Sequence, residues 1–436
     1  MRRNVFIKTF GCQMNAVDSA RMLSLLSQAD YGAAASLEEA DLVLLNTCCI
    51  REKADQKIYS ELGVLRRWKQ RRAGRLVGVG GCLAQQAGDA LRRRAPHVDI
   101  VFGTHNISKL PEMVRRAAER VPSLELAMNG DVGHWDIPPY LPGGATSAMV
   151  TIMQGCDNFC AYCIVPLVRG REVSRSSGDI LAEARALAER GVLEIVLLGQ
   201  NVNSYGNKEG EIPFHDLLLR LSRVEGIRRI RFITSHPRDL DERTIGRFSE
   251  IEALCPHVHL PLQSGSDRIL SSMGRGYTLR EYFGKVAALR KARPGIAFSS
   301  DFIVGFPGET EDDFLRTLEA MEVVRYDSSF SFRFSPRPGT HAAEMCGQVA
   351  PEMSGERLGR LQALQDRHTR GRLSEFVGRE TPVLVEGESA KVRGKLCGRT
   401  PCHKTVNFTE GSGEGPIRKV RVTSARAHSL AGEEIP

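Results

Sequence analysis

The sequence lacks the two features that would place the chain in or beyond a membrane. None of its apolar runs reaches about 18 residues, the minimum for a membrane-spanning helix. The start, MRRNVFIKTFGC, is interrupted by Lys8 and has no small-residue cleavage site after it, so a buried strand is predicted rather than an export signal. We therefore expect a cytoplasmic protein without membrane contact, whose 11 cysteines lie in a reducing compartment where disulfides are rare.

The chain also lacks any repeat of fixed period, and its 436 residues exceed what one hydrophobic core usually serves. Apolar runs alternate with helical patterns, which is typical of an α/β protein with a parallel sheet. We predict an open parallel-sheet domain over 1–130, a Gly- and Pro-rich linker over 131–146, a partial (β/α) TIM-like barrel over 147–374 and a small antiparallel β-barrel over 375–436. The net charge of +8 permits an anionic partner such as nucleic acid.

Three apolar runs in the first domain end in a cysteine. VFIKTFGC ends at Cys12, DLVLLNTC at Cys48 and RLVGVGGC at Cys82. Because the carboxyl ends of parallel strands share one edge of an open sheet, we expect these thiols to converge. Three converging thiolates suit an iron–sulfur cluster or a three-cysteine metal site, and the alternative for each is a buried small hydrophobe. Cys49 should point to the side opposite Cys48, so we expect Cys49→Ser to be nearly silent.

A second cysteine triplet, GCDNFCAYC, follows the apolar run AMVTIMQG. Cys156, Cys160 and Cys163 have C-x3-C-x2-C spacing, and the second knuckle of a zinc ribbon is missing. Three thiolates leave one iron of a four-iron cluster free to bind the amino and carboxylate groups of S-adenosylmethionine (SAM), whose sulfonium is then cleaved by electron transfer. Tyr162 offers its ring to the adenine of SAM, with simple packing as the alternative.

Several later apolar runs come at βα spacing and end in polar residues, at the position where a (β/α) barrel places its active site. These residues are expected to bind the ribose, amine and carboxylate of SAM: Gln200, Asn201, Ser235, His236, Gln263, Ser264 and Asp301. For His236, which precedes Pro237, shaping a turn is the alternative. Thr310 and Asp313 are predicted to form a helix capping box without a catalytic role.

The last domain carries a local excess of positive charge. Residues 389–409 contain five basic side chains and no acid: Lys391, Arg393, Lys395, Arg399 and Lys404. We expect these side chains to contact RNA phosphates, and Phe408 to stack on a base. Cys397 and Cys402, with His403 nearby, are interpreted as barrel residues rather than as a third metal site.

Together the motifs resemble the radical SAM methylthiotransferases. GCDNFCAYC is similar to the radical SAM signature, and further stretches occur in the family's order over nearly the whole chain: TFGCQMN, NTC-IREKA, GCLAQ, VPxxRGREVSRS, LLGQNVNSY, TSHP, LPLQSGSD and SSDFIVGFPGET. Within the family, the likeness is greatest to members that modify tRNA. The C-terminal barrel looks like the family's TRAM module, an RNA binder.

The resemblance implies an enzyme that uses two 4Fe–4S clusters and SAM. Cys12, Cys48 and Cys82 would hold the auxiliary cluster, and the second triplet would hold the SAM-cleaving cluster. The implied reaction adds a methylthio group to C2 of N6-isopentenyladenosine at position 37, in the anticodon stem-loop of tRNA. One SAM would supply the methyl group, and another the deoxyadenosyl radical that abstracts hydrogen from C2. The resemblance identifies neither the electron donor nor the sulfur source.

Two other substrates occur within the family: threonylcarbamoyladenosine in tRNA and an aspartate of a ribosomal protein. The stretch NTC-IREKA and the basic C-terminal barrel favour tRNA and the isopentenyl substrate, by resemblance. A non-enzymatic RNA-binding protein with structural clusters is a further alternative, but it leaves the open coordination site unexplained.

Overall fold

The computed structural model describes residues 3–49, 52–128, 132–208 and 210–436. Ile50 and Arg51 of the NTC-IREKA stretch, and the first residue of the expected linker, lie outside this description. The chain divides into two compact units. The first comprises Met1–Pro142, Met153–Phe159 and Cys163–Arg175, and the second comprises Gly143–Ile152, Cys160–Tyr162 and Ser176–Pro436. Within the described ranges, no helix is long and apolar enough to cross a membrane.

The first unit contains a six-stranded parallel sheet in the order β2-β1-β3-β4-β5-β6, as predicted for the N-terminal region. The strands are β1 (Arg3–Thr9), β2 (Tyr31–Ala33), β3 (Leu42–Thr47), β4 (Leu76–Gly81), β5 (Ile100–Phe102) and β6 (Ser123–Glu125). β3 and β4 are buried along their whole length, which is typical of parallel strands covered on both faces.

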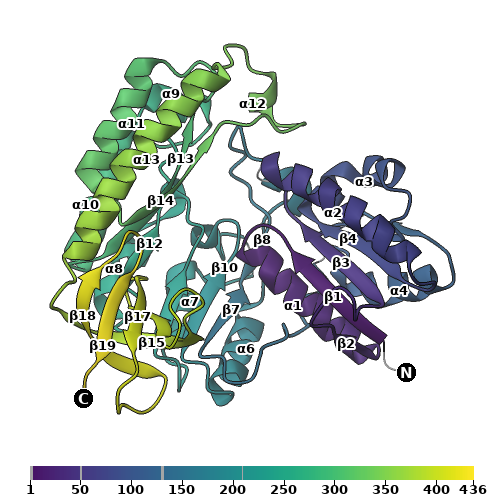
Figure 1. The fold of residues 1–436 in the computed structure, drawn as a ribbon. Helices are drawn as coiled ribbons and strands as arrows, with labels where there is room; N and C mark the ends of the chain where they lie inside the picture. The colour runs from purple at the N-terminus through teal and green to yellow at the C-terminus, as the bar shows by residue number, and fades with distance from the viewer. Residues whose placement is uncertain (1–2, 50–51, 129–131, 209) are drawn as a thin grey trace. The chain divides into compact units, whose positions relative to one another are not determined.

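Helices cover both faces of this sheet (Figure 1). They are α1 (Gln13–Gln28), α2 (Glu52–Gln70), α3 (Cys82–Arg94) and α4 (Leu110–Ala118). Alternate side chains of β3 enter two separate cores: Val43 packs in one core with Trp68 of α2, whereas Leu44 packs in the other with Met22 of α1. The two-residue period of a strand, with a core on each side, therefore explains why the run LVLL (residues 42–45) is apolar at every position.

The second unit contains two three-stranded parallel sheets, in the orders β11-β10-β7 and β12-β13-β14. The strands are β7 (Ser147–Thr151), β10 (Glu194–Leu198), β11 (Arg229–Phe232), β12 (His257–His259), β13 (Ala297–Val304) and β14 (Ser328–Arg333). A parallel bridge from Ile230 to Leu254 links β11 to the segment before β12. The strands therefore form the predicted partial barrel.

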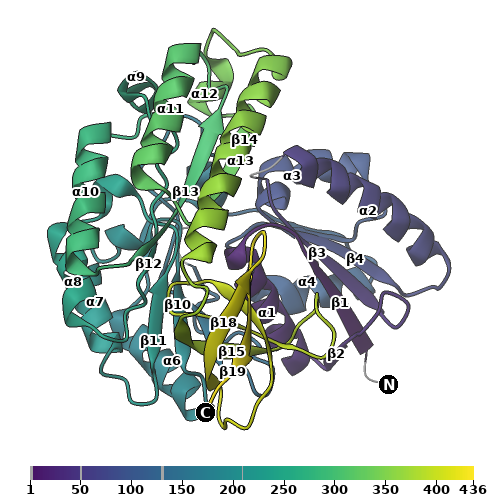
Figure 2. The same ribbon diagram turned by 60° about the vertical axis from the view of Figure 1, so that its left-hand side comes forward.

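Helices flank these strands on their outer side (Figure 2). They are α6 (Ser177–Glu189), α7 (Phe214–Leu221), α8 (Glu242–Glu250), α9 (Asp267–Ser272), α10 (Leu279–Ala292), α11 (Glu311–Val324) and α13 (Pro351–Ser374). The capping box predicted at the start of α11 is confirmed, because Thr310 Oγ1 accepts from Asp313 N at 3.3 Å and the Asp313 carboxylate accepts from Thr310 N at 2.9 Å.

After α13 the chain forms a closed five-stranded barrel in the order β15-β16-β17-β19-β18. The strands are β15 (Glu380–Glu388), β16 (Leu396–Arg399), β17 (Thr405–Thr409), β18 (Ile417–Ala425) and β19 (Leu430–Glu434). The predicted small barrel is confirmed, except that β17 and β19 pair in parallel. Five strands cannot close with every neighbouring pair antiparallel, because alternation around a ring needs an even number.

The small barrel is attached to the partial barrel by buried arginines of β11. Arg229 donates from Nη1 to Arg399 O at 2.9 Å and from Nη2 to Pro382 O at 3.0 Å. Arg231 Nη2 donates to Pro401 O at 3.0 Å. These bonds satisfy carbonyl groups at the edge of the small barrel and hold it against the strands of the same unit.

Candidate functional site

The three strands that end in cysteines are neighbours in the sheet of the first unit. The strand order puts β1, β3 and β4 side by side, and Cys12, Cys48 and Cys82 follow their carboxyl ends. The strand-end arrangement expected from the sequence is therefore confirmed. Gly11 allows the first end to approach the second, since its φ is +111° and a Cβ there would lie 2.4 Å from Cys48 Cβ.

Two asparagines connect the loop that carries Cys12 to the loop that carries Cys48 through hydrogen bonds. Asn15 Nδ2 donates to Asn46 Oδ1 at 3.0 Å and to Thr47 O at 2.9 Å, and Asn46 Nδ2 donates to Asn15 O at 2.7 Å. The Cys12 thiol donates to Asn15 Oδ1 at 3.3 Å. The sequence analysis gave Asn15 no role, although it stands in the stretch TFGCQMN.

A buried cation lies beside the same cysteines. Arg169, from the stretch VPLVRG, is 3% exposed, and its Nη2 donates to Asp18 Oδ2 at 2.8 Å. A hydrogen bond with Cys49, assisted by the positive charge of Arg169, outweighs burial and lowers the pKa of Cys82 to about 6. Cys82 is therefore largely a thiolate at neutral pH, the form that binds iron. The sequence analysis did not find Arg169, because nothing in one sequence marks a single arginine as buried.

The position of Cys49 corrects the expectation that it points away from the triplet. Its side chain is fully buried and hydrogen-bonded to Cys82, and both belong to one hydrophobic cluster. The alternation argument fails because β3 ends at Thr47, so neither Cys48 nor Cys49 has strand geometry. Cys49 is a direct neighbour of a predicted cluster ligand.

Two features of this edge fit an iron–sulfur cluster. Three thiol-bearing strand ends adjoin one another, and one thiol is largely ionised. In the described part of the chain, no three His, Cys, Asp or Glu side chains already enclose a space for a metal ion. The thiols would therefore turn toward a cluster when it binds, and their role as ligands stays a prediction.

The second cysteine triplet divides between the two units. Cys156 and Cys163 belong to the first unit and Cys160 to the second. Cys156 N donates to Gly170 O at 3.3 Å. The preceding Gly155 has a φ of +80°, and a Cβ there would lie 2.0 Å from Arg171 O. The glycine of GCDNFC is thus required because two backbone segments touch at this point.

Cys160 is 8% exposed and has two nitrogen-bearing neighbours in the second unit. Arg275 Nη1 donates to Cys160 Sγ at 3.4 Å and to Tyr162 Oη at 3.3 Å. His236 Nε2 lies 3.8 Å from Cys160 Sγ. The ring of Tyr162 packs on a cluster that includes Phe306. Its expected contact with the adenine of SAM stays a prediction beside this packing role.

His236 has the turn-shaping role that was given as its alternative, and its contact with SAM stays a prediction. Its Nδ1 accepts from Arg238 N at 3.2 Å and so caps the 3-10 turn η3 (Pro237–Asp239). The ring proton therefore sits on Nε2, which faces Cys160. Burial, reinforced by the positive charge of Arg275, holds the pKa of His236 well below its ordinary value, so the ring is neutral.

Two of the residues expected to bind SAM present buried polar atoms without a protein partner. Ser235 Oγ and Gln263 Oε1 have none among the residues described, and their side chains lie after β11 and β12. Gln263 also adopts a φ of +72° while its backbone pairs with β13. Buried polar groups normally find partners, so these two atoms fit a polar cofactor.

The other expected SAM contacts have protein partners of their own. Asn201 Oδ1 accepts from His236 N at 3.1 Å, and its Nδ2 donates to Asp239 Oδ2 at 2.6 Å. Ser264 Oγ accepts from Ser266 N at 3.3 Å, and Asp301 Oδ2 lies 3.4 Å from a histidine ring nitrogen. Gln200 lies two residues after the end of β10 and is half-buried. Their contact with SAM stays a prediction.

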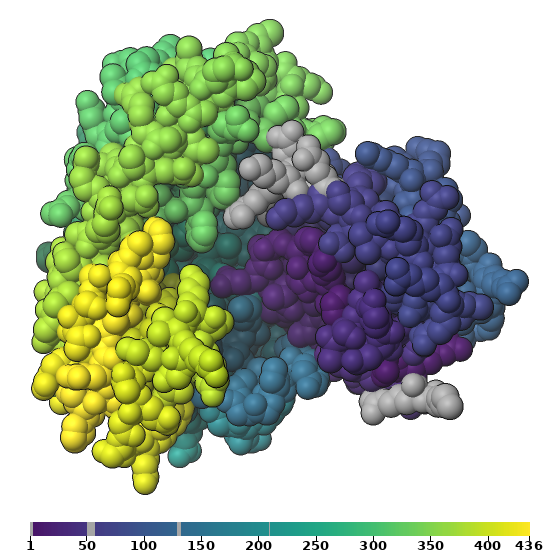
Figure 3. All heavy atoms as spheres, viewed as in Figure 1, coloured from purple at the N-terminus to yellow at the C-terminus, as the bar shows by residue number. Residues whose placement is uncertain are grey.

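The basic side chains of the small barrel separate into exposed and buried groups. Lys391 and Arg393 are exposed on the loop between β15 and β16, and Lys395 is half-buried. Arg399 Nε donates to Glu386 Oε1 at 2.8 Å, so part of its charge is already compensated. Much of the small barrel lies on the surface of its unit (Figure 3), which leaves this loop free for a polyanion.

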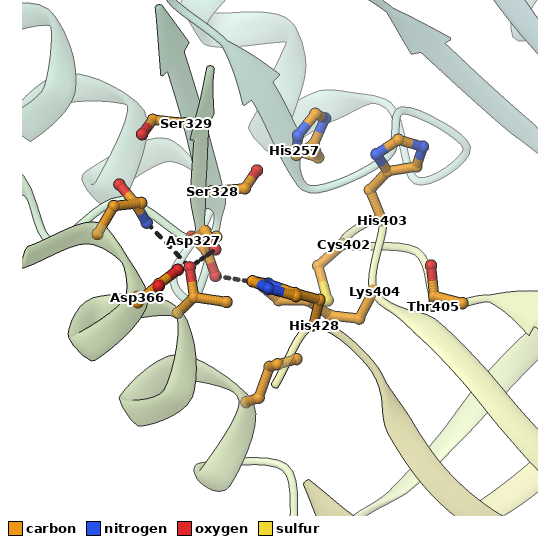
Figure 4. A pocket seen from close by; sticks show the side chains of 13 residues that line it. His257, Asp327, Ser328, Ser329, Asp366, Cys402, His403, Lys404, Thr405 and His428 are labelled. Atoms are coloured by element: carbon orange, nitrogen blue, oxygen red, sulfur yellow. Dashed lines mark hydrogen bonds and ion pairs between the residues drawn. The ribbon is translucent and has the colours of Figure 1, made fainter. Parts of the chain in front are cut away.

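Lys404 and Phe408 are not available for RNA in this structure, and the prediction for these two is wrong. Lys404 Nζ forms a buried ion pair with Asp327, beside a cavity of about 180 Å³ that is also lined by His257 and His403 (Figure 4). Phe408 is 0% exposed and packs in the barrel core with Val406. The alternation of Val406 and Phe408 on one face of β17 was the signal for this burial.

Three family models match successive parts of the chain. The one described as "Uncharacterized protein family UPF0004" matches residues 4–103, the radical SAM superfamily matches residues 150–321, and the TRAM domain matches residues 374–435. These regions correspond to the parallel sheet, the partial barrel and the small closed barrel.

Curated relatives match the chain over nearly its whole length. A protein of Geobacter sulfurreducens named tRNA-2-methylthio-N(6)-dimethylallyladenosine synthase is 50% identical, over 98% of this chain and 97% of its own. A protein of Syntrophus aciditrophicus with the same name is 47% identical, over 99% of this chain and 94% of its own.

Solved structures share the fold at low sequence identity. The radical SAM methyltransferase TsrM of Kitasatospora setae superposes with a TM-score of 0.58 at 16% identity, over 79% of this chain and 77% of that chain. The cobalamin-dependent SAM radical enzyme OxsB gives a TM-score of 0.52 at 14% identity, over 84% and 56%. The likeness to both concerns the fold alone.

Proposed function

Because the chain belongs to the family of radical SAM tRNA methylthiotransferases, we propose that it adds a methylthio group to C2 of N6-isopentenyladenosine in tRNA. The observation that carries the proposal is the presence of two separate cysteine triplets in one chain. The C2–H bond of an adenine has no acidic proton for a general base to remove, so a radical is needed. A second cluster would then carry the sulfur that is transferred, because the free iron of the first cluster is occupied by SAM.

The protein's own groups would bind, orient and shield the reactants. When bound, SAM and the clusters supply the radical, the methyl group and the sulfur. Ser235 Oγ and Gln263 Oε1 would accept or donate hydrogen bonds at the polar groups of SAM, since both atoms are buried and unpaired in the part of the chain that is described. Cys160 is nearly shielded from water, which would protect a radical from side reactions.

We propose that the exposed loop 389–395 contacts the phosphates of the anticodon stem-loop. Lys391 and Arg393 are exposed on this loop, and residues 389–409 contain no acidic side chain that could compensate their charge. The double variant Lys391→Ala/Arg393→Ala should weaken tRNA binding about 10-fold and reduce the slope of log K against log salt by roughly 2, because two phosphate contacts are lost. Filter binding at several salt concentrations measures both quantities.

A matched control is available on the same barrel. Lys419 is exposed but already paired with Glu380 at 2.8 Å, so Lys419→Ala should change neither the affinity nor the salt slope appreciably. Unchanged binding by the double variant would show that the RNA contacts another surface.

The substrate assignment is tested by nucleoside mass spectrometry. The chain is expressed in bacteria that accumulate isopentenyladenosine because their own methylthiolating activity has been deleted. We expect the methylthio derivative of isopentenyladenosine to appear in digested tRNA, and the precursor to decrease. If the precursor persists and methylthio-threonylcarbamoyladenosine appears instead, the proposed substrate is wrong.

A further inference from the structure

Arg275 is a buried cation without an acidic partner. Its side chain is 3% exposed, and in the described residues it forms no ion pair with a carboxylate. This differs from Arg169, whose charge is compensated by Asp18. Arginine remains protonated in proteins, and a buried charge without a counter-charge is costly. Some other negative group must therefore compensate Arg275 in the working protein.

The guanidinium of Arg275 is held in one orientation by four acceptors. Nε donates to Tyr277 Oη at 3.1 Å and Nη2 to Pro261 O at 2.8 Å. Nη1 donates to Tyr162 Oη at 3.3 Å and to Cys160 Sγ at 3.4 Å. Of these groups, only the thiol of Cys160 becomes an anion at neutral pH when it binds iron.

The chain fixes this arginine to the cysteine loop at more than one point. Arg275 stands on the short connection between α9 and α10, and its N donates to Leu270 O at 3.0 Å. Two residues before it, Met273 O accepts from Ala161 N at 2.9 Å. The backbone between Cys160 and Tyr162 thus rests directly on the turn that carries the arginine.

We propose that Arg275 is the counter-charge of the SAM-cleaving cluster, a positioning residue that holds the Cys160 thiolate and makes the cluster easier to reduce. The proposal rests on the proposed function only in assuming a cluster at Cys160. Reduction adds one electron, and therefore one negative charge, to the cluster. A fixed positive charge and a hydrogen bond at a ligand sulfur stabilise that added charge and raise the reduction potential.

The test replaces Arg275 by methionine, glutamine or lysine in a Cys82→Ala background, so that only one cluster forms. The reconstituted cluster is titrated with dithionite and followed by electron paramagnetic resonance. Arg275→Met and Arg275→Gln should shift the midpoint potential to more negative values. SAM cleavage at limiting dithionite should fall by about 10- to 100-fold. Arg275→Lys keeps the charge and should fall between these variants and the parent.

The stability of the cluster-free protein separates this role from a structural one. Pro261 O also accepts from Tyr277 Oη at 3.2 Å, so it keeps a partner in Arg275→Met. The cluster-free variant should therefore melt at the same temperature as the parent or higher, because an uncompensated buried charge is removed. Tyr326→Phe removes another buried hydroxyl, which donates to Tyr282 at 2.8 Å, and should leave the potential unchanged.

An unchanged midpoint potential in Arg275→Met with the cluster intact would overturn the proposal. If the cluster-free variant then also melts at a lower temperature than the parent, the role of Arg275 is structural. This outcome does not depend on the tRNA substrate. Loss of the proposed function would instead appear as normal potentials and normal SAM cleavage without a methylthio product.

Discussion

Replacing Cys160 with alanine is expected to abolish the reductive cleavage of SAM. Cys160 is the proposed cluster ligand that contacts Arg275 and lies near His236, so its loss would remove both a cluster bond and the anion that Arg275 would face. Two thiolates would remain in this triplet, too few for a site-differentiated four-iron cluster. The effect should exceed the roughly 100-fold that loss of a ligand's hydrogen-bond partner causes.

The prediction is tested by measuring the deoxyadenosine and methionine that form from SAM in the presence of dithionite, and the iron content per chain. Iron should fall from about eight to about four atoms, because the auxiliary cluster is retained. Cys255→Ala is the matched control: this thiol is 3% exposed, and burial raises its pKa to about 11, so it is a poor ligand. Substantial deoxyadenosine from Cys160→Ala would remove this cysteine from the cluster.

Replacing Cys82 with alanine is expected to separate the two activities. SAM cleavage should remain measurable because the second triplet is untouched, whereas no methylthio product should form. Cys82 is the triplet thiol that Cys49 and Arg169 hold largely as a thiolate, so it should contribute strongly to cluster binding. Product analysis of modified tRNA and iron content measure the two effects independently.

The neighbouring Cys49 provides the control for this experiment. Cys49→Ala leaves all three proposed ligands in place, so iron should stay near about eight atoms per chain. Loss of its hydrogen bond should raise the pKa of Cys82, and cluster assembly should then become less efficient at lower pH than in the parent. A pH-dependent effect is thus expected for Cys49→Ala at a position that strand alternation had predicted to be nearly silent. Full methylthiolation by Cys82→Ala would refute the auxiliary site.

Much of the architecture was predictable from local patterns. Apolar runs ending in cysteine placed the thiols at strand ends, and the parallel order β1, β3, β4 follows from the usual rule for open sheets. The spacing of Cys156, Cys160 and Cys163 within a stretch of nine residues was enough to predict a SAM-cleaving cluster. The capping box of Thr310 and Asp313 is equally local. These features depend on residues close in sequence, where geometry is set by the backbone alone.

The wrong predictions arose where a rule that holds within one strand or one stretch of sequence was applied to residues outside it. Cys49 was assigned by strand alternation although β3 had already ended at Thr47. Lys404 and Phe408 were assigned to an RNA-binding surface from their place in or beside a basic stretch of sequence. Phe408 lies on the inward face of β17, and Lys404, which precedes β17, is paired with Asp327 outside the small barrel. Burial in a closed barrel depends on all of its strands, so it cannot be read from one.

By itself, the sequence determined the class of fold, the two cysteine triplets and the family. Only the tertiary structure decided which charges are buried and what they face. Arg169 and Arg275 are each distant in sequence from a thiol that they contact, and no spacing connects them. The physical reason is that a buried cation gains its role from the dielectric and the partners around it, and folding alone brings these together.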